Sequence, residues 1–505
     1  MNKFALSLGL GLALTFGLAS TGHAQTYPVP HFGAATRIDG PSAAIVNRTM
    51  ASHFADTTDP RDFGAYCDGT SHVLSGITSL QNAKGALNTA GWSIAQWQAG
   101  GWPHATDTAQ EMDGAAIQEA EYALSALTGG RIKLPSGCFV NRTIHVIRPY
   151  TTISGDGGFG GSIYTYPAHN FNLFSNDAPG NTYASFAINP GGTGGPGGGF
   201  AVAPADGTTE VFAIYDPYVA LATPVFGATL NNRMTVHDVE IQTVWSGILS
   251  GGGDDLINVV HMRGNGGPVG ATGVVWDTPY VDTRQLWNSS VSGFTYGYRA
   301  LGAGASIDVN NTELYNNTIC ANHVPAAGMA QVSIYWTHVF CDTTNSATGG
   351  AVFDARATGS AITRVSIQNS WFGGNSTGSG SFWAGNVRGV SIGGGTQIFG
   401  NNGDGISIDA SVGNAAGFNV ANVQDAGNTG SGVSIGSGVS GWSLTNNVLG
   451  PAADFGANGF AYYIVGGTTD YYRILGNDTH GNTNVPVVGA FSGSGGTHTA
   501  VGNNL

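Results

Sequence analysis

The stretch "VSIQNSWFGGN" at 365–375 decides the fold, because its pattern recurs elsewhere in the chain. "VSIYWTHVF" at 332–340 and "VSIGGGTQIF" at 390–399 share its alternation of apolar and polar residues. Alternation with a period of two places one set of side chains inside a stranded structure and the other set outside. A pattern that returns at a roughly constant spacing of 20–50 residues is typical of solenoids and propellers.

Aligned on this stretch, ten apolar residues form a column with intervals of 21 to 33 residues. They are Val236, Ile257, Leu286, Val309, Ile334, Ile367, Ile392, Val420, Leu444 and Leu475. A second column lies two positions after the first. Six of its ten residues are Asn, including Asn477 in the last coil, and Trp336 occupies the column in another coil. Asn tolerates left-handed backbone, so this column predicts a sharp bend between two short strands. We expect its asparagines to stack in a hydrogen-bonded ladder inside the coil.

A third strand completes each repeat after a glycine-rich bend, as in "GVVWD" 273–277, "GYRAL" 297–301 and "GAVFD" 350–354. Three short strands in a coil of roughly 20–30 residues predict an all-β right-handed parallel β-helix of about ten coils. A β-propeller needs four strands and roughly 40–50 residues per blade, so the period excludes it. The segment 107–127 has apolar residues at helical spacing, and we expect this helix to cap the first coil.

The first 24 residues have the pattern of an export signal. Lys3 precedes an uncharged apolar run that ends at Leu18, and small residues stand at Gly22 and Ala24. A membrane anchor is the alternative, but the run is short for a bilayer span and no second one follows. We therefore expect three parts: a signal at 1–24, an N-terminal segment with capping helix and first coils at 25–157, and the β-helix at 158–505. The expected location is secreted or periplasmic, with no membrane span.

Charge and cysteine content narrow the partners and the compartment. The chain has 17 Lys plus Arg against 31 Asp plus Glu, which argues against a nucleic-acid partner. Four cysteines in an exported protein predict two disulfides, with four free thiols as the alternative. Cys320 and Cys341 are 21 residues apart, about one coil, and would face each other on neighbouring coils. Cys67 and Cys138 would close the N-terminal region.

Four N-terminal motifs together resemble the opening module of pectate-lyase-like β-helix proteins. They are "RDFGAYCDG" 61–69, "DGAAIQEAEYAL" 113–124, "GGRIKLPSGCFV" 129–140 and "TTISGDG" 151–157. This module recurs in exported polysaccharide-degrading enzymes related to polygalacturonases and in phage tailspikes. The resemblance implies the β-helix fold and a polysaccharide as the partner.

The polygalacturonase site does not carry over to this chain. That site places Asn-Thr-Asp, Asp-Asp, Gly-His-Gly and Arg-x-Lys motifs on successive coils. Here "GGGDDL" 251–256 resembles the Asp-Asp motif and "GDG" 403–405 the first one, but their order is reversed. "THGN" 479–482 lacks the Gly-His-Gly pattern, and no Arg-x-Lys follows it.

Candidate catalytic residues come from the outward positions of the coils. Neighbouring coils are ~4.8 Å apart, and carboxylate pairs cleave glycosidic bonds at separations of ~5–5.5 Å or ~6.5–9.5 Å. The predicted catalytic carboxylates are Asp277 and Asp354, with Asp308 or Asp255 as partner. Arg299 and Arg356 are expected to orient substrate, and Trp287 and Trp336 to stack on sugar rings. The alternative is that these aspartates bond turn amides and that the tryptophans fill the core.

A fallback site lies on the outward column of the middle strand. There Glu313 and His338 are predicted one coil apart, where a carboxylate orients an imidazole for acid–base work. A solvated polar face is the alternative. No cofactor and no zinc site are expected. Asp254, Asp255 and Asp277 are the one cluster with the oxygen ligands that calcium takes.

These observations predict an exported enzyme that hydrolyses glycosidic bonds of an extracellular polysaccharide with carboxylates as acid and base. One alternative is a lyase that eliminates across a uronate, with Arg, His or Tyr as base. Another is a non-enzymatic glycan-binding or surface β-helix. Both a monomer and a homotrimer agree with the sequence.

Overall fold

The structure is a computed structural model of residues 1–505 that divides into two units, 1–53 and 54–505. The described residues are 56–82, 85–155, 162–165, 171–190, 211–216, 234–243, 246–251, 255–264, 270–277, 283–302, 306–342, 351–409, 415–451, 455–465, 472–488 and 499–502. All of them belong to the second unit. The predicted export signal and Asp254 lie outside the described residues.

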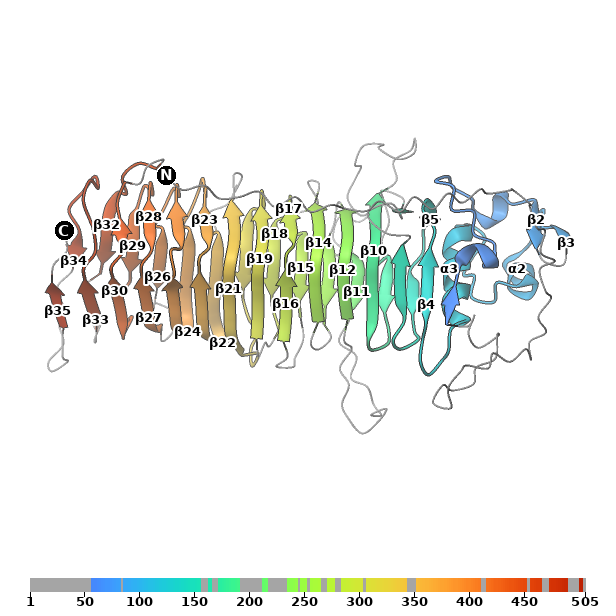
Figure 1. The fold of residues 1–505 in the computed structure, drawn as a ribbon, viewed down its shortest axis with the longest axis horizontal. Helices are drawn as coiled ribbons and strands as arrows, with labels where there is room; N and C mark the ends of the chain where they lie inside the picture. Colours follow the sequence, from blue (N-terminus) through green and yellow to red (C-terminus); the bar gives the residue numbers. More distant parts are fainter. Residues whose placement is uncertain are drawn as a thin grey trace, which may run out of the picture. The chain divides into compact units, whose positions relative to one another are not determined.

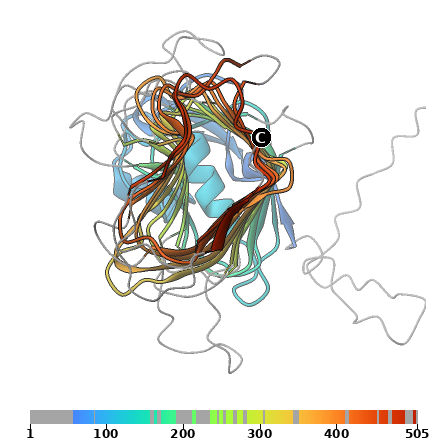
Figure 2. The same cartoon turned by 90° about the vertical axis from the view of Figure 1, so that its left-hand side faces the viewer.

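The described strands form one 33-stranded sheet in which every pairing is parallel, together with one antiparallel hairpin. Figure 1 shows the strands stacked coil after coil, and Figure 2 shows the coils as closed loops around a common axis. The predicted all-β parallel β-helix of about ten turns is confirmed. In the described part of the chain, none of the helices has the length and hydrophobicity to cross a membrane.

The strands have the following bounds. The hairpin and the N-terminal coils contain β1 Thr57–Thr58, β2 Ser79–Asn82, β3 Gly85–Asn88, β4 Arg131–Leu134, β5 Cys138–Val140, β6 Ile144–Val146, β7 Thr152–Gly155, β8 Ser162–Thr165, β9 Phe174–Asn176, β10 Asn181–Pro190, β11 Phe212–Asp216, β12 Met234–Thr243 and β13 Ser246–Ser250. The middle coils contain β14 Asp255–Gly264, β15 Thr272–Trp276, β16 Thr283–Trp287, β17 Ser290–Ser292, β18 Tyr296–Ala300, β19 Ser306–Tyr315, β20 Ile319–His323, β21 Gln331–Asp342, β22 Phe353–Gln368, β23 Trp371–Gly373 and β24 Ser381–Gly393. The C-terminal coils contain β25 Gln397–Phe399, β26 Ile406–Asp409, β27 Ala416–Ala421, β28 Gln424–Ala426, β29 Ser431–Ile435, β30 Trp442–Thr445, β31 Val448–Leu449, β32 Phe460–Ile464, β33 Tyr472–Leu475, β34 Val487–Val488 and β35 Thr499–Gly502.

The predicted bend column has left-handed backbone, as expected, with φ of 48° at Asn369 and 57° at Asn422. In one coil the alignment was wrong by two residues, because the bend residue is His338, with φ of 53°, and not Trp336. Trp336 instead pairs with Val309 and points into the core. The pattern fits both registers because two consecutive inward positions of this strand are apolar.

A second, smaller error occurs at the last aligned coil. Ile474, and not Leu475, pairs with Leu444. The left-handed bend residue there is Gly476, with φ of 66°, and not Asn477.

Asparagine ladders are present, but the bend asparagines stack on the outside of the coil. Asn288 joins Asn258 and Asn311 through side-chain hydrogen bonds of 2.9 Å, and this ladder is solvent-exposed. A different set of asparagines forms the internal ladder. Its members are Asn375, Asn401, Asn428, Asn458 and Asn482, and from Asn401 onward each Oδ1 accepts the backbone N–H of the asparagine before it at 2.9–3.2 Å.

A buried chain of polar side chains crosses the core of the middle coils. The indole Nε1 of Trp336 donates to the hydroxyl of Tyr298 at 2.7 Å, and that hydroxyl lies 2.8 Å from Nε2 of His323. Nδ1 of His323 lies 2.9 Å from Oε1 of Gln331, whose amide donates to the Ala300 carbonyl. Each buried group therefore has a partner, as a core requires.

The helix α3, Met112–Tyr122, packs across the first coil and confirms the predicted cap (Figure 2). It is shorter than the predicted 107–127, and Leu127 beyond its end is 82% exposed. Within the residues that the structure describes, three shorter helical segments precede it, η1 Pro60–Phe63, η2 Leu74–Gly76 and α2 Ile94–Gly100. The buried carboxylate of Asp113 accepts the backbone N–H groups of Cys67 and Phe139, which ties the N-terminal segment to the coil.

Both predicted disulfides, Cys67–Cys138 and Cys320–Cys341, are present. The first joins the N-terminal segment to β5. The second links β20 and β21.

Candidate functional site

One column of side chains on the third strand of each coil contains two predicted site residues, Arg299 and Asp354. Its members pair in register across neighbouring coils and are His145, Ser175, Tyr215, Leu249, Val275, Arg299, Asn322, Asp354 and Phe382. Because parallel pairing places such residues one coil apart, Arg299, Asn322 and Asp354 follow each other at ~4.8 Å. We call Arg299, Asn322, Asp354, Arg356 and Phe382 the third-strand cluster.

Asp354 is the central carboxyl group of the third-strand cluster. It is only 4% exposed, and Oδ1 accepts a hydrogen bond from Nε of Arg356 at 2.8 Å. Burial raises the pKa of Asp354, although the Arg356 guanidinium acts in the opposite direction. The guanidinium of Arg356 also lies 4.9 Å from the centre of the Phe382 ring. A carboxyl group whose pKa is raised by burial is suited to donate a proton.

Arg299 and Asn322 offer polar groups beside Asp354. Nε of Arg299 is buried and makes no hydrogen bond with the described residues, while its guanidinium lies 4.7 Å from the Tyr296 ring centre. The side-chain amide of Asn322 makes none within this part of the chain either. An unpaired polar group is costly to bury, so the buried Nε of Arg299 favours a polar ligand or water at this position, with the amide of Asn322 one coil away.

The four predicted catalytic carboxylates do not converge. Asp277 is exposed and directly follows β15, whereas Asp354 lies on β22, three coils further along the same face. Three coil steps correspond to ~14 Å, beyond the reach of a catalytic pair. Asp409 is nearer, because it pairs with Ala384, which pairs with Arg356.

Asp255 is inside the coil and is not a surface carboxylate. Its Oδ1 accepts the backbone N–H of Met234 at 2.8 Å, and its Oδ2 accepts the hydroxyl of Ser250. Asp255 and Asp277, named as the one candidate calcium cluster together with Asp254, differ in position, since Asp255 is buried inside the coil and Asp277 is exposed. Within the described ranges, the one group with metal-ligand geometry is Cys67, Asp113 and Cys138, whose two sulfurs are bonded to each other.

Asp308 and Trp287 lie on the first strand of their coils. The indole Nε1 of Trp287 donates to Oδ2 of Asp308 at 3.1 Å, and burial raises the pKa of this carboxyl group. Tyr335 pairs with Asp308 and is 41% exposed, so an aromatic ring and a carboxyl group adjoin on this face. Trp336, predicted to stack on sugar, is wholly buried and unable to do so.

The fallback pair of Glu313 and His338 does not form as predicted. Glu313 pairs with Phe340, whereas His338 is the bend residue two positions before Phe340 and lies opposite the bend residue Asn311. Both side chains are exposed. This correction follows from the two-residue shift of the bend in that coil.

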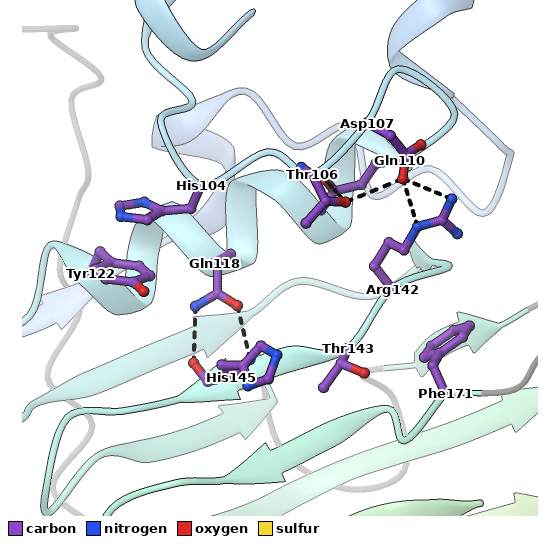
Figure 3. A pocket seen from close by; sticks show the side chains of 10 residues that line it. All are labelled: His104, Thr106, Asp107, Gln110, Gln118, Tyr122, Arg142, Thr143, His145 and Phe171. Carbon is purple, nitrogen blue, oxygen red and sulfur yellow. Dashed lines mark hydrogen bonds and ion pairs between the residues drawn. The ribbon is translucent and has the colours of Figure 1, made fainter. Parts of the chain in front are cut away.

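A pocket of about 440 Å³ lies between α3 and β6 and was not predicted (Figure 3). It is lined by His104, Thr106, Asp107, Gln110, Gln118, Tyr122, Arg142, Thr143, His145 and Phe171. Sequence spacing gives no signal for it, because its lining comes from segments far apart in the chain. Asn322 was also missed, although its segment "CANH" 320–323 follows "GYRA" 297–300 by one repeat.

The similarity of the chain to known proteins is low. No family model matches the chain, and no curated protein matches it. Among solved structures, the A-module of mannuronan C-5 epimerase AlgE4 from Azotobacter vinelandii is similar with a TM-score of 0.49 and 13% identity, covering 89% of this chain and 100% of that one. The AlgE6 A-module from the same organism has a TM-score of 0.40 and 14% identity, covering 86% and 96%.

The catalytic unit of a GH87 α-1,3-glucanase from Streptomyces thermodiastaticus has a TM-score of 0.38 and 13% identity, covering 74% of this chain and 66% of that one. The parallel stack of strands in the structure itself confirms the sequence resemblance to pectate-lyase-like β-helix proteins at the level of fold.

Proposed function

We propose that this protein is a carbohydrate-active enzyme that cleaves glycosidic bonds of an extracellular polysaccharide at the third-strand cluster. The observation that supports the proposal is the buried carboxyl group of Asp354, whose pKa is raised even though Arg356 bonds it. Such a group keeps its proton at a higher pH than an exposed Asp and delivers it to the oxygen of the leaving sugar. Arg299 and Asn322 bind substrate hydroxyl groups beside it.

Asp409 is the second carboxylate in the hydrolytic form of the proposal. It lies two coils from Arg356, so its backbone is ~12 Å from that of Asp354 by coil spacing and strand rise. Aspartate side chains that lean toward each other narrow this separation to the ~6.5–9.5 Å of an inverting pair, with room for the attacking water. Asp409 then acts as the general base.

A lyase is the second candidate, and the two arginines favour it. Arg299 lies two coils before Asp354 along the column, and Arg356 lies two residues after Asp354 on β22, where it bonds the carboxyl group. Guanidinium groups bind a carboxylate in planar, bidentate geometry and would neutralise the uronate carboxyl group during elimination. The product then carries a double bond and no water is added.

Purified protein is incubated with neutral and uronate polysaccharides, with and without calcium, while reducing ends and the absorbance of unsaturated uronate are followed. New reducing ends alone indicate hydrolysis, and both signals together indicate elimination. We expect D354N to lower the rate about 10²–10⁴-fold, the usual contribution of a general acid. D277N is the matched control on the same face and should keep the wild-type rate. Binding without cleavage on every substrate would instead identify a non-enzymatic glycan-binding protein.

A further inference from the structure

The pocket at the N-terminal cap and the third-strand cluster lie on one face of the β-helix. His145 lines the pocket and is also the first member of the register column that contains Arg299 and Asp354. Seven coil steps separate His145 from Asp354 along this column, which corresponds to ~34 Å. A polymer that follows the face would therefore reach both places, while a short oligosaccharide would occupy one of them.

The two histidines that line the pocket each bond a carboxylate through the same ring nitrogen, Nδ1. Nδ1 of His104 lies 2.9 Å from the carboxylate of Glu119, and Nδ1 of His145 lies 2.7 Å from that of Asp177. Because a carboxylate only accepts, Nδ1 carries the hydrogen in both rings and Nε2 is left for a ligand. Gln118 fixes the strand beneath by bonding the backbone N–H and C=O of His145 at 2.8 and 2.9 Å.

The charges around the pocket are balanced. Arg142 donates to Asp107 through Nε at 3.0 Å and forms an ion pair with it through Nη2 at 2.9 Å. The two imidazoles each have their own carboxylate, as described above. With every lining cation paired, the wall lacks the unpaired positive charge that would select an anionic group. The hydroxyl of Thr143 makes no hydrogen bond in the described structure and is available to a ligand.

Aromatic rings stand at both ends of the pocket. The rings of His104 and Tyr122 are stacked, with centroids 3.3 Å apart and an interplanar angle of 5°. Figure 3 shows this stack at one end, Phe171 at the other, and Arg142, Gln118 and His145 between them. Flat rings with polar tips around them suit the apolar face and the hydroxyl groups of a sugar. The volume is within the range of small-molecule sites, roughly 300–1,000 Å³.

We propose that this pocket is a second sugar-binding site, which holds neutral, hydroxyl-rich units of the same polysaccharide chain that is cleaved at the third-strand cluster. The choice of ligand rests on the proposed function. The pocket anchors the polymer on the face, and the cleavage site acts on a stretch ~34 Å away.

The test follows the imidazole NMR signals of the full chain in the D354N background, which keeps the substrate intact. Titration uses tetrasaccharides from β-glucan, xylan and mannan, with oligogalacturonate as the anionic comparison. We expect the signals of His104 and His145 to shift and saturate with at least one neutral tetrasaccharide. Unmoved signals at saturating concentration of every sugar, or shifts with oligogalacturonate alone, overturn the proposal.

Substitutions supply the second readout, the affinity for the intact polymer. H104A should weaken it about tenfold, equivalent to about 1.4 kcal/mol. H480A is the matched control, since His480 also bonds a carboxylate through Nδ1, at 3.0 Å from Asp478, but is 76% exposed and lies outside the pocket. If H104A lowers the melting temperature of the protein, T143V is the alternative pocket variant, because it replaces a hydroxyl group by a methyl group of similar size. Wild-type polymer affinity in both pocket variants contradicts the proposal.

The two proposals fail differently. If the wild-type protein cleaves no polysaccharide but His104 and His145 respond to a neutral sugar, the enzyme assignment falls and the sugar site remains. If polysaccharide is cleaved but neither imidazole responds, the enzyme assignment remains and the sugar site falls.

Discussion

Replacing Tyr298 by phenylalanine probes the buried polar chain in the core. Its hydroxyl oxygen accepts from Trp336 at 2.7 Å, so its own hydrogen donates to Nε2 of His323 at 2.8 Å. His323 then carries its hydrogen on Nδ1, which donates to Gln331 at 2.9 Å. Phenylalanine preserves the ring but leaves the indole N–H and the imidazole Nε2 without partners in a site that excludes water.

Each buried polar group that loses its partner costs about 1–3 kcal/mol, so the free energy of unfolding of Y298F should fall by about 2–6 kcal/mol. Equilibrium denaturation in guanidinium chloride measures the difference. The matched control is Y335F, because Tyr335 adjoins Trp336 in sequence but is on the surface. That control should lie within about 0.5 kcal/mol of the wild type. An equally small effect in Y298F would refute the role assigned to the chain.

The same chain predicts a pH dependence of stability. Desolvation lowers the pKa of His323 to about 4 from its usual 6.5, so the folded protein keeps this imidazole neutral. Below pH 6.5 the unfolded chain binds a proton that the folded chain does not. The neutral imidazole of His323 therefore makes its whole contribution to the free energy of unfolding above pH 6.5. This contribution declines as the pH falls toward 4, by about 3 kcal/mol at most. H323Q should flatten this part of the stability profile, and an unchanged slope would contradict the assignment.

Three further predictions concern other parts of the fold. Serine at both Cys320 and Cys341 opens a loop of 21 residues and should lower the free energy of unfolding by about 3 kcal/mol. If the fully reduced wild type melts at the same temperature as the oxidised protein, this prediction is refuted. N428A removes an acceptor from the internal asparagine ladder and should cost about 2–4 kcal/mol in denaturation; a loss under 0.5 kcal/mol, roughly that of a surface change, would show that water replaces it. D177N should lower the pKa of His145, which hydrogen bonding to Asp177 raises, and NMR titration of that imidazole checks the direction.

The fold was predictable because the repeat depends on local chemistry. Alternation sets which side chains face inward, and the left-handed bend favours Asn or Gly, so the sequence shows both features in most coils. The register failed where these signals were ambiguous. Both Ile334 and Trp336 are apolar and inward, and the bend residue His338 is not a typical bend former. Only the pairing with the previous coil distinguishes the two alignments.

The candidate site was less predictable, because the direction of a side chain depends on the residue at which a strand begins. Asp255 begins β14 and points inward, whereas Asp354 is the second residue of β22 and points outward. The residues around Asp255 and Asp354 in the sequence do not indicate which of the two side chains points inward. The pocket at the cap was beyond sequence reasoning for another reason. Its two histidine–carboxylate pairs join residues 15 and 32 positions apart. The pair of His104 and Glu119 involves α3, the pair of His145 and Asp177 joins two neighbouring coils, and the packing of α3 on the coil brings both pairs to one pocket.

The parallel stacking of coils makes this protein close to a one-dimensional array, in which each unit is stabilised by the two units beside it. The free energy of such an array is approximately a sum of terms for single units and for neighbouring pairs. A substitution at Asn428 would then unfold the coils around it at a lower temperature than the coils that carry Arg299 and Asp354. Partial melting and loss of the proposed activity should therefore occur at different temperatures, and the interval between them measures how far cooperativity extends along the axis.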